Sequence, residues 1–203
     1  MNLYHPFVLR ELGPEDVHIF HKLRLSGLNE SPESFGAHES EWKDLHQDEI
    51  VRRMGCDAEA FVLGAFIQSA VAANSDAANT AHSTSAMEEK AAGQSDLIGL
   101  AGFRRHKGIK TQHCGSVWGV YIDPKSRGKG VAKALMIELL TRVRRIEGLE
   151  KILLAVTSHN TAALKLYERL QFKTYGFEKH ALKIGERYVD EYLMSLNLGT
   201  EDL

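Results

Sequence analysis

The chain has 203 residues, 43% of them hydrophobic, which is typical of a single globular domain, and its 25 Lys and Arg residues nearly balance its 27 Asp and Glu residues. This balance gives no bulk electrostatic reason to expect a nucleic acid or an anionic membrane as partner. The N-terminus lacks the pattern of a signal peptide, and no apolar stretch approaches the ~20 residues of a membrane span. Cys56 and Cys114 stand apart, without the spacing of a zinc site or a disulfide framework. We therefore expect a cytoplasmic protein without a metal.

The first third of the chain predicts a strand, two helices and a second strand. Residues 7–12 (FVLREL) have the character of a strand, and the acids after Pro14 mark a helix whose apolar positions repeat at helical spacing until Gly27. After a polar loop, a second helix is expected at about 40–54 and a buried strand at 60–67 (AFVLGAFI).

Residues 68–96 differ from the rest of the chain in composition. They are rich in Ala, Ser, Asn and Thr and offer almost nothing to bury, so we expect a flexible low-complexity hairpin insertion, with a short helix at 85–92 as the alternative. Strands are expected on either side of a polar turn, at 97–103 and 116–122, and consecutive strands without intervening helices indicate antiparallel hairpins. We therefore expect one domain over 1–203.

The remaining residues alternate between helices and strands. The expected elements are a helix at 130–147, a buried strand at 151–156 (KILLAV), a helix at 160–170, and closing strands at 175–177 and 188–196. The strand–helix–strand unit over 116–156 requires a right-handed crossover between parallel strands. The sequence therefore predicts an α/β (α+β) fold with a mixed sheet.

The stretch RGKGVA, residues 127–132, joins a predicted strand to a predicted helix. The first-turn N–H groups of a helix lack partners within the helix and carry partial positive charge, and glycines let a ligand approach that backbone closely. Arg127, Lys129 and Lys133 add formal positive charge, so this junction suits a diphosphate. The alternative is a glycine-rich turn that only starts a helix.

Two common phosphate motifs fail at this junction and a third fits. The P-loop pattern GxxxxGK[ST] fails because Asp123 and Gly130 occupy its first and last positions, and the dinucleotide pattern GxGxxG fails at Lys133. The pattern [QR]xxGx[GA] is matched by Arg127, Gly130 and Ala132.

A second motif follows about 30 residues later, where residues 160–172 read NTAALKLYERLQF. The residues that match the pattern NxxAxxLYxxxGF are Asn160, Ala163, Leu166, Tyr167 and Phe172, with Gln171 in place of the usual glycine. With these two spaced motifs the chain resembles the GNAT acyltransferase superfamily, and the likeness extends along most of the sequence except the insertion.

The resemblance implies a GNAT-like fold: a mixed, mostly antiparallel sheet of six to seven strands with a central, splayed parallel pair, flanked by about four helices. It implies an N-acetyltransferase that moves an acetyl group from acetyl-CoA to a primary amine of a small molecule or a protein by direct attack. The residues it implies for cofactor binding are Val120, Tyr121, Ile122, Arg127, Gly128, Lys129, Gly130, Val131, Ala132 and Asn160.

The resemblance implies a catalytic acid but leaves the general base undefined. It implies that Tyr167 is the acid for the departing thiolate, although an aromatic residue at helical spacing is more often a packing residue. Asn160 is either a contact to the cofactor or a helix N-cap, or both. His159 is expected to face solvent. The general base stays open, because the central strand carries no acid; the candidates by position are Glu33, His113, His180 and Asp190.

The acceptor pocket is expected between residues 29–35, the Trp118 region and the 179–188 loop, with Phe35, Trp118 and Tyr188 either as an aromatic wall or as ordinary core. A second reading of the chain is a non-catalytic acyl-CoA-binding module, and a third, disfavoured by the failed motifs, is a nucleotide-binding α/β protein. The sequence leaves open whether a homodimer forms.

Overall fold

The computed structural model describes residues 7–67 and 96–199, which form a single seven-stranded sheet in the order β1-β2-β3-β4-β5-β7-β6. The strands are β1 (Phe7–Glu11), β2 (Ala60–Ile67), β3 (Leu97–Arg105), β4 (Cys114–Ile122), β5 (Lys151–Thr157), β6 (Lys173–Ile184) and β7 (Arg187–Asn197). The helices are α1 (Val17–Glu30), α2 (Ser40–Lys43), α3 (Gln47–Met54), α4 (Val131–Val143) and α5 (Thr161–Arg169). β4 and β5 run parallel and the other neighbouring strands run antiparallel, so the predicted mixed fold is confirmed.

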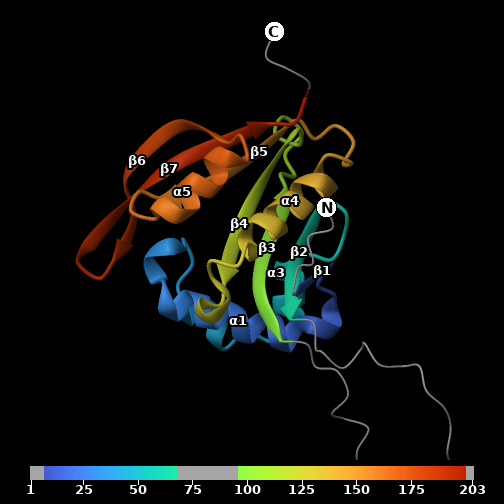
Figure 1. Cartoon of the computed structure of the whole chain (residues 1–203), viewed down its shortest axis with the longest axis vertical. Helices are drawn as coiled ribbons and strands as arrows, with labels where there is room; N and C mark the ends of the chain where they lie inside the picture. Colours follow the sequence, from blue (N-terminus) through green and yellow to red (C-terminus); the bar gives the residue numbers. More distant parts are fainter. Residues whose placement is uncertain (1–6, 68–95, 200–203) are drawn as a thin grey trace, which may run out of the picture.

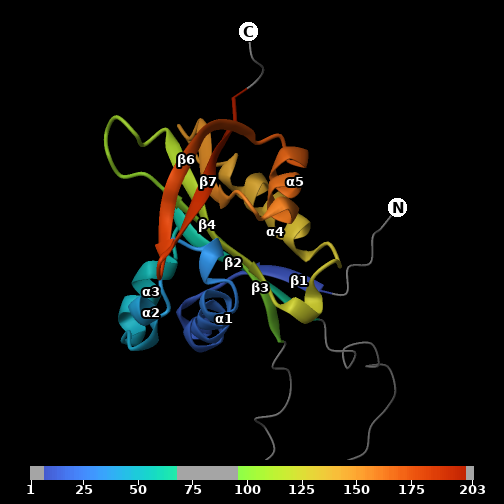
Figure 2. The ribbon, with the colours of Figure 1, turned by 90° about the vertical axis from the view of Figure 1, so that its left-hand side faces the viewer.

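Helices cover both faces of this sheet (Figures 1 and 2). On one face, α1 and α3 bury Phe20 and Met54 against β2, β3 and β4. On the other, α4 buries Leu135 and Leu139 in a larger core that also holds Tyr167 of α5. The sheet therefore separates two cores. No helix in the described ranges is long and apolar enough to cross a membrane.

Helix α1 continues to Glu30, past Gly27 where the sequence predicts its end. Gly27 is buried, and a Cβ at this position would lie only 3.0 Å from the Tyr121 ring. The glycine is therefore needed for the close approach of α1 to β4, and the prediction of a helix stop was wrong because tertiary packing, and not a turn, requires the small residue.

The segment at 40–54 is two helices and not the one helix expected. His46 leaves the helical conformation (φ −67°, ψ 150°) and its ring accepts a hydrogen bond from the Asp48 N–H, so it begins α3 as an N-cap. Helix α4 also ends at Val143, earlier than expected. Cap chemistry at single residues thus decides boundaries that apolar spacing leaves undefined.

The closing strands are longer than predicted, because β6 and β7 form an extended hairpin with only Gly185 and Glu186 between them. The expected 179–188 loop is therefore mostly strand. β6 is an edge strand with little burial, so its sequence lacks the apolar pattern on which the prediction depends.

The expected insertion at 68–96, including the alternative helix at 85–92, lies outside the described residues except for Asp96. Its two ends lie together, because β2 and β3 pair antiparallel and the Ile67 N–H donates to the Asp96 carbonyl at 3.0 Å. We propose that the chain is one domain over 1–203 that carries this insertion at a hairpin tip.

Replacing residues 68–95 with a four-residue turn is expected to keep the fold. A connection that is roughly sevenfold shorter loses less conformational entropy when its ends are brought together on folding. The free energy of unfolding should therefore stay equal or rise by about 1–2 kcal/mol. Urea unfolding followed by circular dichroism measures this difference. Loss of a cooperative transition in the shortened chain would show instead that the segment is part of the fold.

Candidate active site

The parallel pair separates halfway along its length. β4 and β5 are paired only from Cys114 opposite Lys151 to Ser116 opposite Leu153. Beyond that point β5 pairs only with β7, while β4 stays with β3. The two strands therefore diverge and leave an opening in the middle of the sheet, as expected for a splayed pair.

A β-bulge in β4 lies at this opening. Gly119 and Val120 oppose the single residue Ala101 of β3, and Gly119 has a positive φ of 64°. A bulge leaves one residue outside the regular ladder and turns its backbone groups away from the neighbouring strand. The bulge lies next to the cavity described below.

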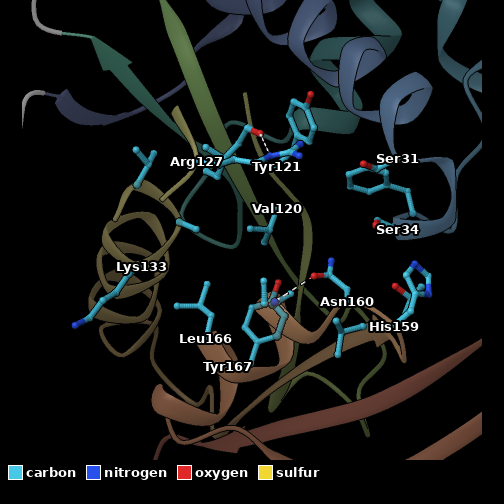
Figure 3. Close-up of a pocket in the computed structure, with 18 of the residues that line it drawn as sticks. Ser31, Ser34, Val120, Tyr121, Arg127, Lys133, His159, Asn160, Leu166 and Tyr167 are labelled. Carbon is cyan, nitrogen blue, oxygen red and sulfur yellow. Dashed lines mark hydrogen bonds between the residues drawn. The ribbon is translucent and has the colours of Figure 1, made fainter. Parts of the chain in front are cut away.

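A cavity of about 580 Å³ fills the opening between the two strands (Figure 3). In Figure 3, Tyr121 and Arg127 lie on one side of it, Leu166 and Tyr167 on the other, and Val120 between them. The lining residues are Ser31, Glu33, Ser34, Phe35, Val120, Tyr121, Ile122, Ser126, Arg127, Gly128, Gly130, Val131, Ala132, Lys133, Ala155, Val156, Thr157, His159, Asn160, Ala162, Ala163, Leu166 and Tyr167. All but one of the residues expected to bind the cofactor line this cavity; the exception is Lys129.

The glycine-rich loop presents bare backbone to the cavity. Gly128 and Gly130 have φ values of 75° and 80°, and a Cβ added to either would meet no atom within 4 Å. Gly130 is the N-cap of α4, so the free N–H groups of the first helical turn, with their partial positive charge, lie beside this open backbone. Lys133 adds a cation in the same turn. These features fit a diphosphate.

The positive charge of Arg127, which the sequence analysis counts toward the diphosphate site, is already paired with a carboxylate. Its Nε donates to the Ile122 carbonyl at 3.0 Å, and its Nη2 lies 2.8 Å from the Glu30 carboxylate. The Tyr121 hydroxyl also donates to Glu30, and burial together with this contact raises the pKa of Tyr121. Arg127 therefore fastens the loop to α1 and β4, while the backbone and Lys133 remain available to an anion.

Asn160 and Tyr167 lie on the opposite wall. The Asn160 side-chain oxygen accepts from the Ala163 N–H at 3.1 Å, so Asn160 is the N-cap of α5 and also lines the cavity. Tyr167 is buried, its ring packs edge-on against Phe172 at 5.9 Å, and burial raises its pKa to about 12. A phenol with this pKa keeps its proton throughout the neutral range and can donate it.

Only one of the four expected base candidates lies at the cavity. Glu33 lines it, and its Oε1 is 4.0 Å from Nε2 of His159. His159 is exposed, as expected, and it also lines the cavity. The His113 carbonyl instead accepts from Glu150 and Lys151, where β4 and β5 are still paired. Of the other two, the backbone N–H of His180 donates to Oδ1 of Asp190 across the β6–β7 hairpin at 2.8 Å.

The expected aromatic wall is only partly assembled. Phe35 lines the cavity with its neighbours Ser31 and Ser34, but Trp118 packs over Gly102 and Tyr188 stacks on His180 at 4.5 Å. Both serines belong to the 29–35 segment that the sequence analysis expects at the acceptor pocket, although no motif marks them individually.

A sheet opened at one parallel pair, with a glycine-rich helix start on one wall and a buried tyrosine on the other, defines a protein with a cleft for a long phosphorylated ligand. The model of the acetyltransferase (GNAT) family matches residues 37–172. The chain therefore belongs to the GNAT acetyltransferase family.

Curated relatives match over a shorter segment. Mycothiol acetyltransferase of Salinispora tropica is 38% identical over 80 residues, which are 39% of this chain and 26% of that protein. The L-amino acid N-acetyltransferase AaaT of Escherichia coli is 35% identical over 79 residues, which are 38% of this chain and 48% of that protein. The matched segment thus spans about a quarter of the first relative and about half of the second.

Solved structures match over nearly the whole chain. A GNAT-family acetyltransferase from Streptococcus pneumoniae aligns with a TM-score of 0.72 and 18% identity, covering 95% of this chain and 99% of that one. The protein yncA of Salmonella typhimurium, solved with its cofactor acetyl-CoA, aligns with a TM-score of 0.68 and 15% identity, covering 97% and 96%. At these identities the likeness establishes the fold.

Proposed function

We propose that the protein is an N-acetyltransferase that moves the acetyl group of acetyl-CoA to a primary amine by direct attack. The observation that carries this proposal is the convergence on one cavity of the open glycine backbone, the bulge of β4 and the buried Tyr167. The cradle at Gly128 and Gly130 suits the diphosphate, and the gap between β4 and β5 suits the extended arm of the cosubstrate.

In the reaction the amine nitrogen forms a bond to the acetyl carbon, and the bond from that carbon to sulfur breaks. A backbone N–H at the Val120 bulge supports the negative charge that develops on the carbonyl oxygen. Tyr167 donates its proton to the departing thiolate, and burial, which raises its pKa to about 12, keeps the hydroxyl protonated before that step. The site supplies proximity and charge stabilisation, and it needs no covalent intermediate with the protein.

An amine with a pKa near ~10.4 is protonated at neutral pH and must lose a proton before it attacks. We propose that Glu33 and His159 accept this proton. Their side chains lie 4.0 Å apart at the cavity, between η2 (Pro32–Ser34) and the start of α5. Both side chains line the cavity, and Figure 3 shows His159 on the same side as Asn160.

Glu33→Gln is expected to lower kcat by about 10²-fold at pH 7, with the acetyl-CoA affinity unchanged, since Glu33 is not part of the glycine cradle. The deficit should shrink as the pH approaches 10, because the amine then loses its proton without help. The matched control is Glu168→Gln, at an exposed position of α5 outside the cavity. A deficit of equal size at every pH would remove Glu33 from proton transfer.

The proposal is tested by thiol release from acetyl-CoA across a panel of amines. Stable acetyl-CoA binding without thiol release on any amine would favour the alternative function, a non-catalytic acyl-CoA-binding module, which the lack of an acid on β4 supports. The name of the Escherichia coli relative makes amino acids the first members of the panel. We further propose that the protein acts in the cytoplasm, in keeping with its free thiols Cys56 and Cys114.

A further inference from the structure

Arg24 of α1 is a buried cation that forms no ion pair with any residue in the described ranges, and only the more distant charge of Glu41 acts to raise its pKa. The residue is only 5% exposed, and in the described part of the chain its Nε and Nη1 have no hydrogen-bond partner. Several other arginines pair with carboxylates, as Arg10 does with Asp16 and Arg53 with Glu49. Burial lowers the pKa of Arg24 to about 10, so the guanidinium still carries its charge at neutral pH.

The surroundings of Arg24 are aromatic. Its guanidinium carbon lies 4.8 Å from the ring centroid of Phe35, 5.1 Å from that of Trp42 and 5.9 Å from that of Trp118. Cation–π contacts offset part of the cost of burial, but they leave the N–H donors unsatisfied. A buried guanidinium with free donors is a costly arrangement that an anion would relieve.

Arg24 lies directly behind one wall of the active-site cavity. Phe35, the nearest of its rings, also lines the cavity. Gly119 of the β4 bulge is its neighbour on the other side, since a Cβ there would stand 3.5 Å from Nη1 of Arg24. The next residue, Val120, lines the cavity. The guanidinium thus lies between Phe35 and the β4 bulge, just behind the cavity wall, and does not itself line the cavity.

We propose that Arg24 binds the carboxylate of the acceptor, so that the substrate class is an amine that also carries a carboxylate, of which an α-amino acid is the smallest member. The planar fork of a guanidinium matches a carboxylate through two parallel hydrogen bonds, which would pair two of its N–H groups and supply the missing counterion. This inference rests on the proposed acetyl transfer and adds the chemistry by which the acceptor is recognised.

The test compares matched acceptors on the unaltered protein. Thiol release is measured with each of a set of α-amino acids and with the corresponding primary amides, at one pH and at saturating acetyl-CoA. We expect the acids to have a kcat/KM about 10- to 100-fold higher than their amides, mainly through a lower KM, which is the size of a lost charge-assisted hydrogen bond. The amide's amine loses its proton more readily, so amine basicity works against this preference.

Arg24→Met should remove the preference for acids while acetyl-CoA still stabilises the protein, and Arg24→Lys should keep the charge and recover part of the preference. Arg53→Met is the matched control, because Arg53 also lies 5.1 Å from the Trp42 ring but is paired with Glu49. If Arg24→Met does not fold, the comparison of acids with amides on the unaltered protein and on Arg24→Lys remains decisive.

Equal rates with acids and amides, or a preference that survives in Arg24→Met, would overturn the carboxylate site and leave Arg24 as a packing residue. Thiol release with amides or simple amines but with no acid would overturn it as well. Failure of the proposed function is distinguishable, since it appears as a lack of stabilisation by acetyl-CoA, or as stabilisation without thiol release on any acceptor, whether acid, amide or simple amine.

Discussion

Ala132→Glu is expected to abolish acetyl-CoA binding, with a loss of affinity of at least ~10²-fold. Ala132 lies in the first turn of α4 and lines the cavity beside Gly130. A carboxylate there adds negative charge at the cradle that we assign to a diphosphate. Two like charges about 4 Å apart near a protein surface repel by roughly 4 kcal/mol at an effective dielectric constant of 20. Isothermal titration calorimetry measures the affinity.

Ile137→Glu is the matched control for this substitution, because Ile137 lies on the same helix and is 46% exposed, outside the cavity. It adds the same charge to α4 and should leave the affinity for acetyl-CoA within about twofold, since exposed charges are screened over roughly 8–10 Å. Equal affinities for Ala132→Glu, Ile137→Glu and the unaltered protein would refute the assignment of the phosphate site.

Tyr167→Phe is expected to lower kcat by about 10²-fold while the affinity for acetyl-CoA stays nearly the same. The substitution removes one hydroxyl and keeps the ring that packs against Phe172, so neither the core nor the cavity wall should change. Burial raises the pKa of Tyr167 to about 12, so the hydroxyl remains a proton donor across the assay range, and the deficit should be constant from about pH 6 to pH 9.

Single-turnover and steady-state kinetics on the same variant separate the chemical step from binding. Tyr175→Phe, at an exposed tyrosine of β6, controls for the general loss of a hydroxyl and should keep full activity. Unchanged turnover in Tyr167→Phe would mean that Tyr167 only packs, which is the ordinary role of an aromatic residue at helical spacing.

Much of the glycine cradle could be predicted because its residues are close in sequence. The spacing of Arg127, Gly130 and Ala132 and that of Asn160 and Tyr167 are local patterns, and each lies at a strand-to-helix junction where backbone geometry limits the choice of residue. The cavity brings both patterns together. The succession of most strands and helices along the chain could also be predicted, because apolar runs and apolar spacing are local patterns too.

The parts that were missed depend on contacts between distant segments. Gly27 reads as a helix stop, and only the ring of Tyr121 against it explains why the helix continues. Arg24 reads as one more charged position on a helix, and its burial among three rings from other segments has no signature in spacing. The β6–β7 hairpin was underestimated because hydrogen bonds to a neighbouring strand, and not burial, hold most of β6.

The central claim is that the opening between β4 and β5 binds acetyl-CoA. Thermal unfolding with and without millimolar acetyl-CoA tests this claim most directly, and ATP and NAD serve as comparison ligands. The midpoint should rise with acetyl-CoA and stay unchanged with NAD, because a ligand that binds only the folded state stabilises it by mass action. Stabilisation by ATP or NAD and none by acetyl-CoA would contradict the assignment of the glycine cradle and, with it, the proposed acetyl transfer.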